Sequence, residues 1–128
     1  MEYTETTENI KITVVSEHVR ESSLPEDGVY AFSYSIQIEN LNEEPVQLLE
    51  RHWVVISGQK RTAEIAGPGL LGDQPVLDSG EVYSFDSAAV IQDPVGAMEG
   101  FYIFKTGEGQ YVQAHVPRCD LLYPVIMH

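Results

Sequence analysis

The sequence predicts an all-β fold, an antiparallel β-sandwich of about seven to nine strands. Three observations predict it. Short apolar runs alternate with polar residues along much of the chain, turn residues separate these runs, and no convincing amphipathic helix is present. A series of short strands at this spacing is typical of two antiparallel sheets packed face to face.

The first half of the chain contains three predicted strands. Residues 1–8 are polar and acidic, so we expect a frayed tail. Residues 10–14 alternate apolar and polar side chains, as a half-buried strand does. Residues 30–38 form the cleanest period-two run, and we expect their even-numbered side chains in the core. Residues 46–57, which include Trp53, are apolar on both faces, as in the middle of a sandwich sheet.

The second half continues with further strands between turn signals. A hairpin turn at residues 57–60 leads into the first of them. Residues 121–127 form a last apolar segment that Pro124 interrupts, which favours an edge or a short extension. The strands expected between these two points are 61–66, 81–87, 98–105 and 110–116, the last two forming a hairpin.

Length and composition indicate one cytoplasmic domain. The 128 residues suit a single domain spanning 1–128, and 43% of them are hydrophobic. Cys119 is the one cysteine, so no internal disulfide can form. The chain begins without a basic, apolar leader, and no apolar stretch approaches the ~20 residues that span a bilayer. We therefore expect a cytoplasmic location.

The charge of the chain restricts its partners. Seven Lys and Arg face twenty Asp and Glu, giving a formal net charge of −13. Such a field repels phosphate backbones and anionic lipid, so we expect neither nucleic acid nor membrane as a partner. Solubility explains most of the acidity, and a cationic partner or a divalent metal is the alternative.

A glycine-rich stretch spells G-x-G-x-x-G at Gly67, Gly69 and Gly72. In a dinucleotide site such glycines lie between a strand and a helix that holds the pyrophosphate. Here Pro68 removes one amide donor, and Pro75 prevents a helix from following. The stretch is better explained as a structural connection between sheets, in which we expect Leu70 and Leu71 to plug the core.

Several motifs resemble the bacterial ApaG family. The match is carried by the run from Gly67 to Ser87, by Pro94-x-Gly96-x-Met98-x-Gly100-x-Tyr102, by Pro45 to Leu49, by Arg51-His52-Trp53 and by the ending Pro124 to His128. Pro68 and Ser79 depart from the usual pattern, both within turns. The resemblance covers roughly residues 10–128.

The resemblance implies a fold and several functions. It implies an immunoglobulin- or fibronectin-III-like sandwich, and a family linked to cobalt resistance and magnesium efflux. Similar domains inside eukaryotic F-box proteins and polymerase-interacting proteins imply protein binding. The glycine motif has been discussed in the family as a pyrophosphate site.

No constellation of residues supports catalysis, so we expect no enzyme activity, no catalytic residue, no cofactor and no metal site. The cluster Arg51, His52 and Trp53 is the best candidate for partner binding, because Trp and Arg are enriched at interface hot spots. By strand parity Arg51 and Trp53 share one face and His52 points the other way. Trp53 by itself is more typical of a sandwich core.

The leading hypothesis is a non-enzymatic binding module for a protein partner of unknown identity. It would use the face near Arg51 together with the loops at Gly67–Gly72 and Gln92–Gly96. A homodimer through an edge strand is left open. The alternative is a small-ligand protein that binds a divalent cation or a pyrophosphate or nucleotide at the Gly67–Gly72 loop.

Overall fold

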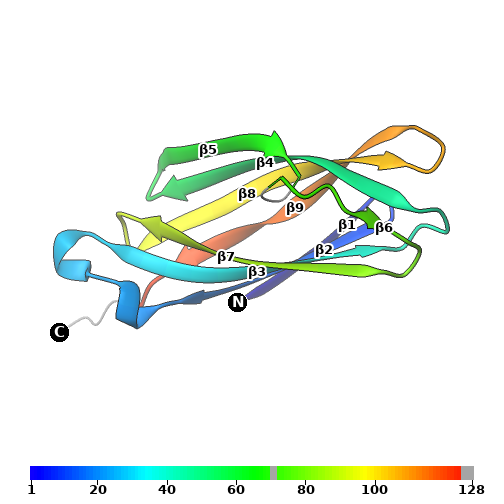
Figure 1. Ribbon diagram of the computed structural model, residues 1–128. Helices are drawn as coiled ribbons and strands as arrows, with labels where there is room; N and C mark the ends of the chain where they lie inside the picture. The colour runs from blue at the N-terminus through cyan, green and yellow to red at the C-terminus, as the bar shows by residue number, and fades with distance from the viewer. Residues whose placement is uncertain (70–71, 125–128) are drawn as a thin grey trace.

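The computed structural model describes residues 1–69 and 72–124, which form two antiparallel β-sheets packed as a sandwich (Figure 1). Two short 3-10 helices, η1 (Arg20–Ser22) and η2 (Pro25–Asp27), interrupt the strands. The strands are β1 (Glu2–Thr7), β2 (Ile10–His18), β3 (Tyr30–Asn40), β4 (Val46–Ser57), β5 (Lys60–Pro68), β6 (Val76–Leu77), β7 (Val82–Ile91), β8 (Val95–Thr106) and β9 (Tyr111–Leu122). The predicted all-β sandwich is confirmed.

The first sheet has the strand order β1-β2-β3-β7, and the second has the order β5-β4-β8-β9 with β6 beside β4. Two pairings join strands far apart in sequence. β3 pairs with β7 from Tyr30↔Ile91 to Glu39↔Val82, and β4 pairs with β8 from Val46↔Thr106 to Ser57↔Gly96. These long-range pairings decide which side chains share a face.

The expectation that residues 1–8 fray is wrong for most of them. Residues 2–7 form β1, which pairs with β2 from Glu2↔Val15 to Thr7↔Ile10. Glu8 and Asn9 make the turn in the left-handed region, with φ of 52° and 57°, as two-residue hairpins require. Threonine is enriched in strands, and an unpaired β2 edge accepts another strand, so a polar segment is ordered here.

The core lies between the inward faces of the two sheets. The predicted alternation is confirmed. In β2 the side chains of Ile10, Ile12 and Val14 are fully buried, and in β3 Phe32, Ile36 and Ile38 are each 1% exposed. Tyr30 and Tyr34, on the same face of β3, are only half-buried. The largest fully buried side chains elsewhere include Leu48, Ile91, Met98, Tyr102, Phe104 and Leu121.

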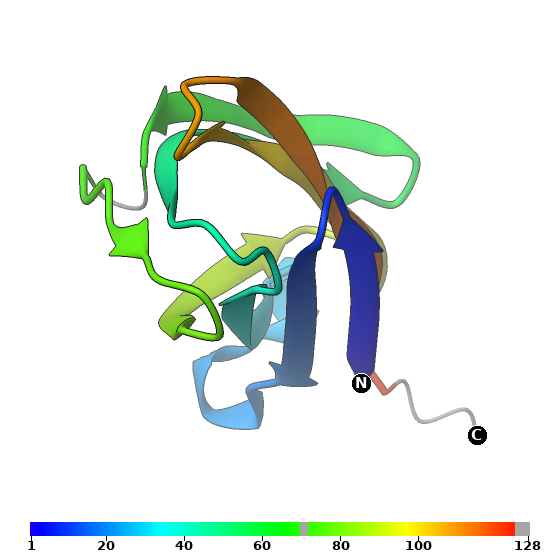
Figure 2. The same ribbon diagram turned by 90° about the vertical axis from the view of Figure 1, so that its right-hand side faces the viewer.

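The two long sides of the sandwich differ. On the closed side β9 packs against β1 and β2 (Figure 2), and the Cys119 thiol donates to Ser16 Oγ over 3.2 Å. On the open side β5 and β7 are the last strands of their sheets, and in the described part of the chain no strand pairs with their outer edges.

Two predictions fall partly outside the described residues. The core plug expected from Leu70 and Leu71 lies there, as does the chain beyond Pro124. Within residues 1–69 and 72–124, no helix is long and apolar enough to cross a membrane.

Candidate functional site

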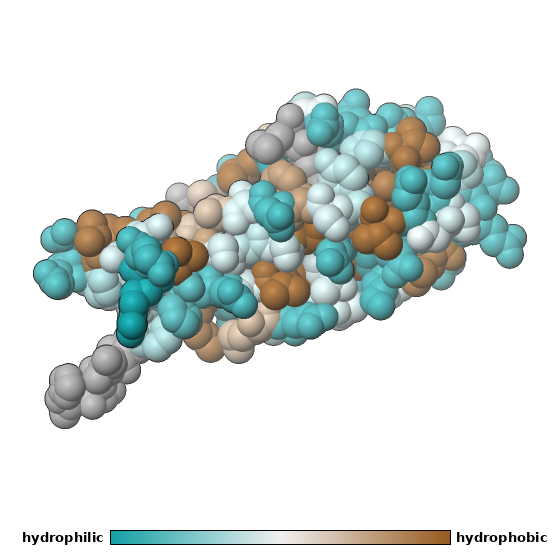
Figure 3. All heavy atoms as spheres, turned by 60° about the horizontal axis from the view of Figure 1, so that its bottom comes forward, coloured by the Kyte–Doolittle hydropathy of each residue, from teal (hydrophilic) through white to brown (hydrophobic). Residues whose placement is uncertain are grey.

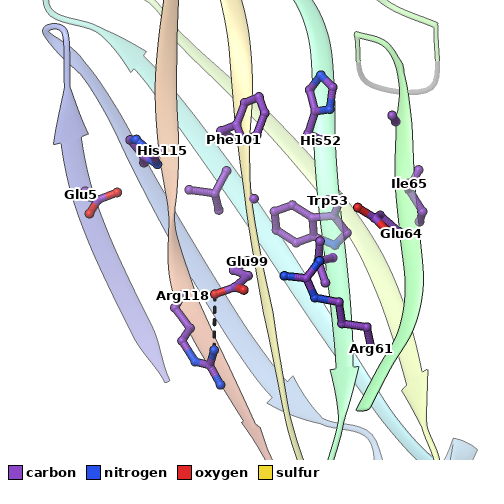
Figure 4. Close-up of a pocket in the computed structure, with 14 residues that line it drawn as sticks. Glu5, His52, Trp53, Arg61, Glu64, Ile65, Glu99, Phe101, His115 and Arg118 are labelled. Atoms are coloured by element: carbon purple, nitrogen blue, oxygen red, sulfur yellow. Dashed lines mark hydrogen bonds and ion pairs between the residues drawn. The ribbon is translucent and has the colours of Figure 1, made fainter. Parts of the chain in front are cut away.

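The outer face of the second sheet is hollowed into a groove of about 470 Å³ (Figure 4). The groove crosses β5, β4, β8 and β9, and Glu5 of β1 lies at its far end. Its polar and aromatic lining residues are Glu5, His52, Trp53, Arg61, Glu64, Glu99, Phe101, His115 and Arg118. We call this surface the groove.

An aromatic pair lies in the middle of the groove. His52 of β4 and Phe101 of β8 are register partners, and their rings stack with centroids 4.4 Å apart at 16°. His52 Nε2 also lies 3.4 Å from Glu50 Oε2, and both side chains are well exposed. The stack gives the groove a flat, rigid surface with a polar edge, which suits contact with a partner side chain.

Close packing of the strands under the groove depends on Gly100. It lies opposite Trp53 on β4, and a Cβ at this position would collide with the carbonyl oxygen of His52. Only glycine therefore allows β8 to approach β4 this closely. The neighbouring Phe101 ring is brought over His52 as a result.

Charged side chains of both signs line the same groove as the aromatic pair and lie mostly toward its other end (Figure 4). Arg118 Nη1 lies 3.3 Å from Glu99 Oε2, and Arg118 Nε lies 3.7 Å from Asp120 Oδ1. Arg61 and Glu64 lie on the β5 side of the groove (Figure 4). The ion pairs of Arg118 with Glu99 and Asp120 are exposed, so they add little to the stability of the fold. Their charges stay accessible to a partner.

The predicted cluster Arg51, His52 and Trp53 is divided between the two faces of β4, as strand parity predicts. Trp53 is 6% exposed, and its ring stacks on Tyr34 with centroids 5.9 Å apart. Arg51 also reaches inward, where its Nε is buried without a hydrogen-bond partner among the described residues. Of the three residues, His52 contributes its ring to the groove.

The inward position of Arg51 brings its charge close enough to act on the Tyr102 hydroxyl. Burial raises the pKa of the Tyr102 hydroxyl well above its ordinary value, Tyr34 raises it further, and the Arg51 charge opposes the rise. Tyr102 is 1% exposed. Arg51 therefore acts on the core between the sheets, and we assign it no part in the groove.

The glycine loop forms part of the fold. Gly69 N donates to Leu49 O over 2.8 Å, and Gly72 N donates to Pro68 O over 3.2 Å. Both glycines have positive φ, 56° and 89°. The amides of Gly69 and Gly72 already have acceptors and Pro68 has no N–H, so these three described positions offer no free donor to a phosphate group.

Gly67, unlike Gly69 and Gly72, does not have a positive φ. It lines a shallow hollow of about 600 Å³ together with His52, Ala66 and Tyr111, next to the groove. The other predicted loop, Gln92–Gly96, lies at the opposite end of β4, where Gly58 N donates to Val95 O over 2.7 Å. Gly67 and His52 therefore line one continuous surface, whereas the loop Gln92–Gly96 lies apart from it.

The described residues, 1–69 and 72–124, contain no group of three or more His, Cys, Asp or Glu placed to hold a metal ion. Cys119 and His115, which are close in sequence, are separated in environment. Cys119 is fully buried, and burial raises the pKa of its thiol, whereas His115 is exposed at the groove.

Sequence reasoning missed most of the groove. No sequence motif marks the groove residues Phe101, Glu99, His115 and Arg118. They come close to His52 because β4 pairs with β8, a strand that is distant in the sequence. Strand parity within the 98–105 and 110–116 hairpin could have placed Phe101 opposite His115. The pairing with β4 had no signal in the sequence.

Comparisons with known proteins agree on one family. A sequence model of the ApaG domain matches residues 20–106. Protein ApaG of Proteus mirabilis is 35% identical over 123 residues, covering 96% of this chain and 98% of its own length. Protein ApaG of Rhodospirillum centenum is 38% identical over 122 residues, covering 95% and 94%. The crystal structure of an ApaA protein from Bordetella pertussis has a TM-score of 0.86 at 30% identity, covering 90% and 94%. The chain therefore belongs to the ApaG family.

Proposed function

We propose that this ApaG-family domain is a non-enzymatic interaction module that binds a protein partner in the groove. The observation that carries the proposal is the His52–Phe101 stack, which shares a hollow of about 470 Å³ with two arginines and three glutamates. A central aromatic surface with a polar, charged rim is the arrangement typical of protein interfaces. Arginine and aromatic residues dominate their hot spots.

The charges of the groove suit recognition by a mixed-charge partner. Arg61 and Arg118 are two of only seven basic residues in a chain of net charge −13, and both line the groove. Complementary charges at an interface fix orientation and exclude wrong partners. The groove thus contains charges of both signs, Arg61 and Arg118 beside Glu5, Glu64 and Glu99.

A pair of matched variants tests the proposal by affinity capture from a lysate of the source organism. The groove variant is His52→Ala with Arg61→Glu. The control variant is His18→Ala with Arg20→Glu, which makes the same changes at exposed residues outside the groove. We expect the control variant to capture as much partner as the wild type does. The groove variant should capture at least about tenfold less. Equal retention by both variants would refute the proposal.

A small-ligand function has less support and a separate test. The loop amides of Gly69 and Gly72 donate within the protein, as described above. A thermal-shift screen with magnesium, cobalt, ATP and diadenosine tetraphosphate would detect such a ligand, since binding to the native state raises Tm. We expect no shift of several degrees. Metal homeostasis and a cytoplasmic location remain expectations from the family and the sequence.

A further inference from the structure

β7 is the outer strand of the first sheet on the open side, and it lacks the usual protection of edge strands. It pairs with β3 along its whole length without a bulge. Its sequence contains no Pro, Lys or Arg, and Asp86 is its single charged residue. Natural edge strands are blocked by lysine, proline, bulges or a covering segment. β5, across the open side, has Lys60, Arg61 and Pro68.

The backbone groups on the free edge of β7 can be identified. Val19 N donates to Ala31 O, whereas Asn40 N donates to Glu81 O, so odd-numbered residues of β3 bond toward β2 and even-numbered ones toward β7. The register joins even-numbered β3 residues to odd-numbered β7 residues. The N–H and C=O groups that point to the free edge therefore belong to Val82, Ser84, Asp86, Ala88 and Val90.

A slot of about 320 Å³ opens between β5 and β7, at the end of β7 that contains Ala88–Val90. Trp53 and Tyr34, which stack on each other, also line it. Trp53 is 6% exposed, and its Nε1–H has no acceptor among the described residues. A buried donor without a partner is costly. An occupant that supplies an oxygen acceptor would remove this cost.

The inward side chains of β7 remain incompletely covered. Tyr83 and Phe85 pack against the core but are only half-buried, and the outward Val82 and Val90 are 50% and 53% exposed. Apolar side chains interrupt the polar surface on the underside of the molecule, where the first sheet lies (Figure 3). A strand added beside β7 would cover the inward side chains and extend the core.

The charge around β7 selects the occupant. β3 and β7 contain one charged residue each, Glu39 and Asp86, and the segments flanking β7 add Glu81 and Asp93. A second copy of this chain would bring another net charge of −13 to this edge. Like charges across an interface are costly, so a basic segment is favoured.

We propose that β7 is a docking edge at which an extended, basic segment of a partner protein adds as a further strand. The segment pairs its backbone with the even-numbered residues of β7 and places one of its oxygen acceptors in the slot, within reach of Trp53 Nε1–H. Addition of a strand to an exposed sheet edge is an established mode of peptide recognition. Trp53 and Ile65 line both the slot and the groove, whereas the free-edge amides of β7 belong to this surface alone and separate the proposal from the groove.

The first test is a titration of the ¹⁵N-labelled protein with two pools of nine-residue peptides. One pool alternates Val or Ile with Lys or Arg, and the other replaces each basic residue with Glu. We expect the basic pool to shift the amides of β7 and the indole N–H of Trp53, the one tryptophan in the chain, and the acidic pool to shift neither. Shifts confined to Phe101 and its neighbours, or no shift at millimolar peptide, would overturn the proposal.

Two variants and a control complete the test. Ala88→Pro removes a free-edge N–H at an exposed residue. Asp86→Lys reverses the charge and keeps the proposal testable if the proline variant does not fold. We expect each variant to bind the basic pool at least about tenfold more weakly than the wild type does. Asp27→Lys, the same reversal on η2, should leave binding unchanged. Equal weakening of binding by Asp27→Lys would contradict the proposal. So would a wild-type protein that sediments as a dimer and becomes monomeric in the Asp86→Lys variant.

Discussion

On the closed side of the sandwich β9 lies against β1 and β2, whereas on the open side β5 and β7 end their sheets without a paired neighbour in the described residues. The closed side buries Cys119 and Leu121 completely. The open side leaves Ile65 and Val90 40% and 53% exposed. The difference indicates that the closed side is packed more completely than the open side.

Gly69→Val should produce the largest loss of stability, because it adds a side chain directly after β5 at a position on the open side that has no room for one. Gly69 has φ of 56°, and a Cβ there would collide with the carbonyl oxygen of Asp73. Left-handed strain and overpacking each cost about 1–3 kcal/mol. We expect a loss of about 2–6 kcal/mol in the free energy of unfolding, measured by urea denaturation.

Gly72 supplies the control for that substitution. It also has positive φ, 89°, but a Cβ at this position has open space around it. Gly72→Val should therefore show the strain alone and lose less stability than Gly69→Val. Equal losses would mean that the contact with Asp73 is unimportant.

A matched pair of alanine substitutions compares the two sides directly. Leu121→Ala on the closed side empties a fully buried position and should cost about 2–5 kcal/mol. Val90→Ala on the open side removes a side chain that is 53% exposed, and should change stability by no more than about 0.5 kcal/mol. Denaturant unfolding of both variants measures the contrast. Similar costs at the two positions would contradict the distinction between the sides.

The smallest expected effect is a pH dependence from Cys119 on the closed side. Burial raises the pKa of its thiol, although a hydrogen bond to Ser16 and the N-terminal amine oppose the rise. The native state therefore keeps the proton after the unfolded state has lost it. Stability from this group is complete below the unfolded pKa of about 8.5 and declines as the pH rises toward the native value.

Cys119→Ala isolates this dependence. Between pH 8 and pH 10, the free energy of unfolding of the wild type should fall faster than that of Cys119→Ala, by at most about 1.4 kcal/mol per pH unit. Urea denaturation at several pH values measures both slopes. Parallel slopes would show that the thiol has the same pKa in both states.

The sequence predicted the strands well where one local signal was sufficient. Alternation placed Ile10, Ile12 and Val14 in the core, and parity separated His52 from Trp53. The sequence analysis missed β1, because a strand of Glu and Thr with the single aromatic Tyr3 has no apolar alternation and depends on the edge of β2 for its order. Local polarity was a poor guide where a neighbouring strand supplied the hydrogen bonds.

The candidate sites were predicted less well than the fold. His52 was identified, but Phe101 becomes its stacking partner only through pairing of β4 with β8, which no local pattern encodes. The slot likewise joins Trp53 with Ala89 across two sheets. The glycine motif was the opposite case, since a strong pattern at Gly69 and Gly72 serves loop geometry. Long-range strand order therefore determines the groove and the slot.

Hydrogen exchange of the individual β7 amides tests the open edge most directly. The amides of the odd-numbered residues, such as Tyr83 and Phe85, pair with β3 and should exchange slowly. The amides of Ser84, Asp86 and Ala88 should exchange orders of magnitude faster, because they face the free edge. Slow exchange of both sets would show that the edge of β7 is already covered and would contradict this account.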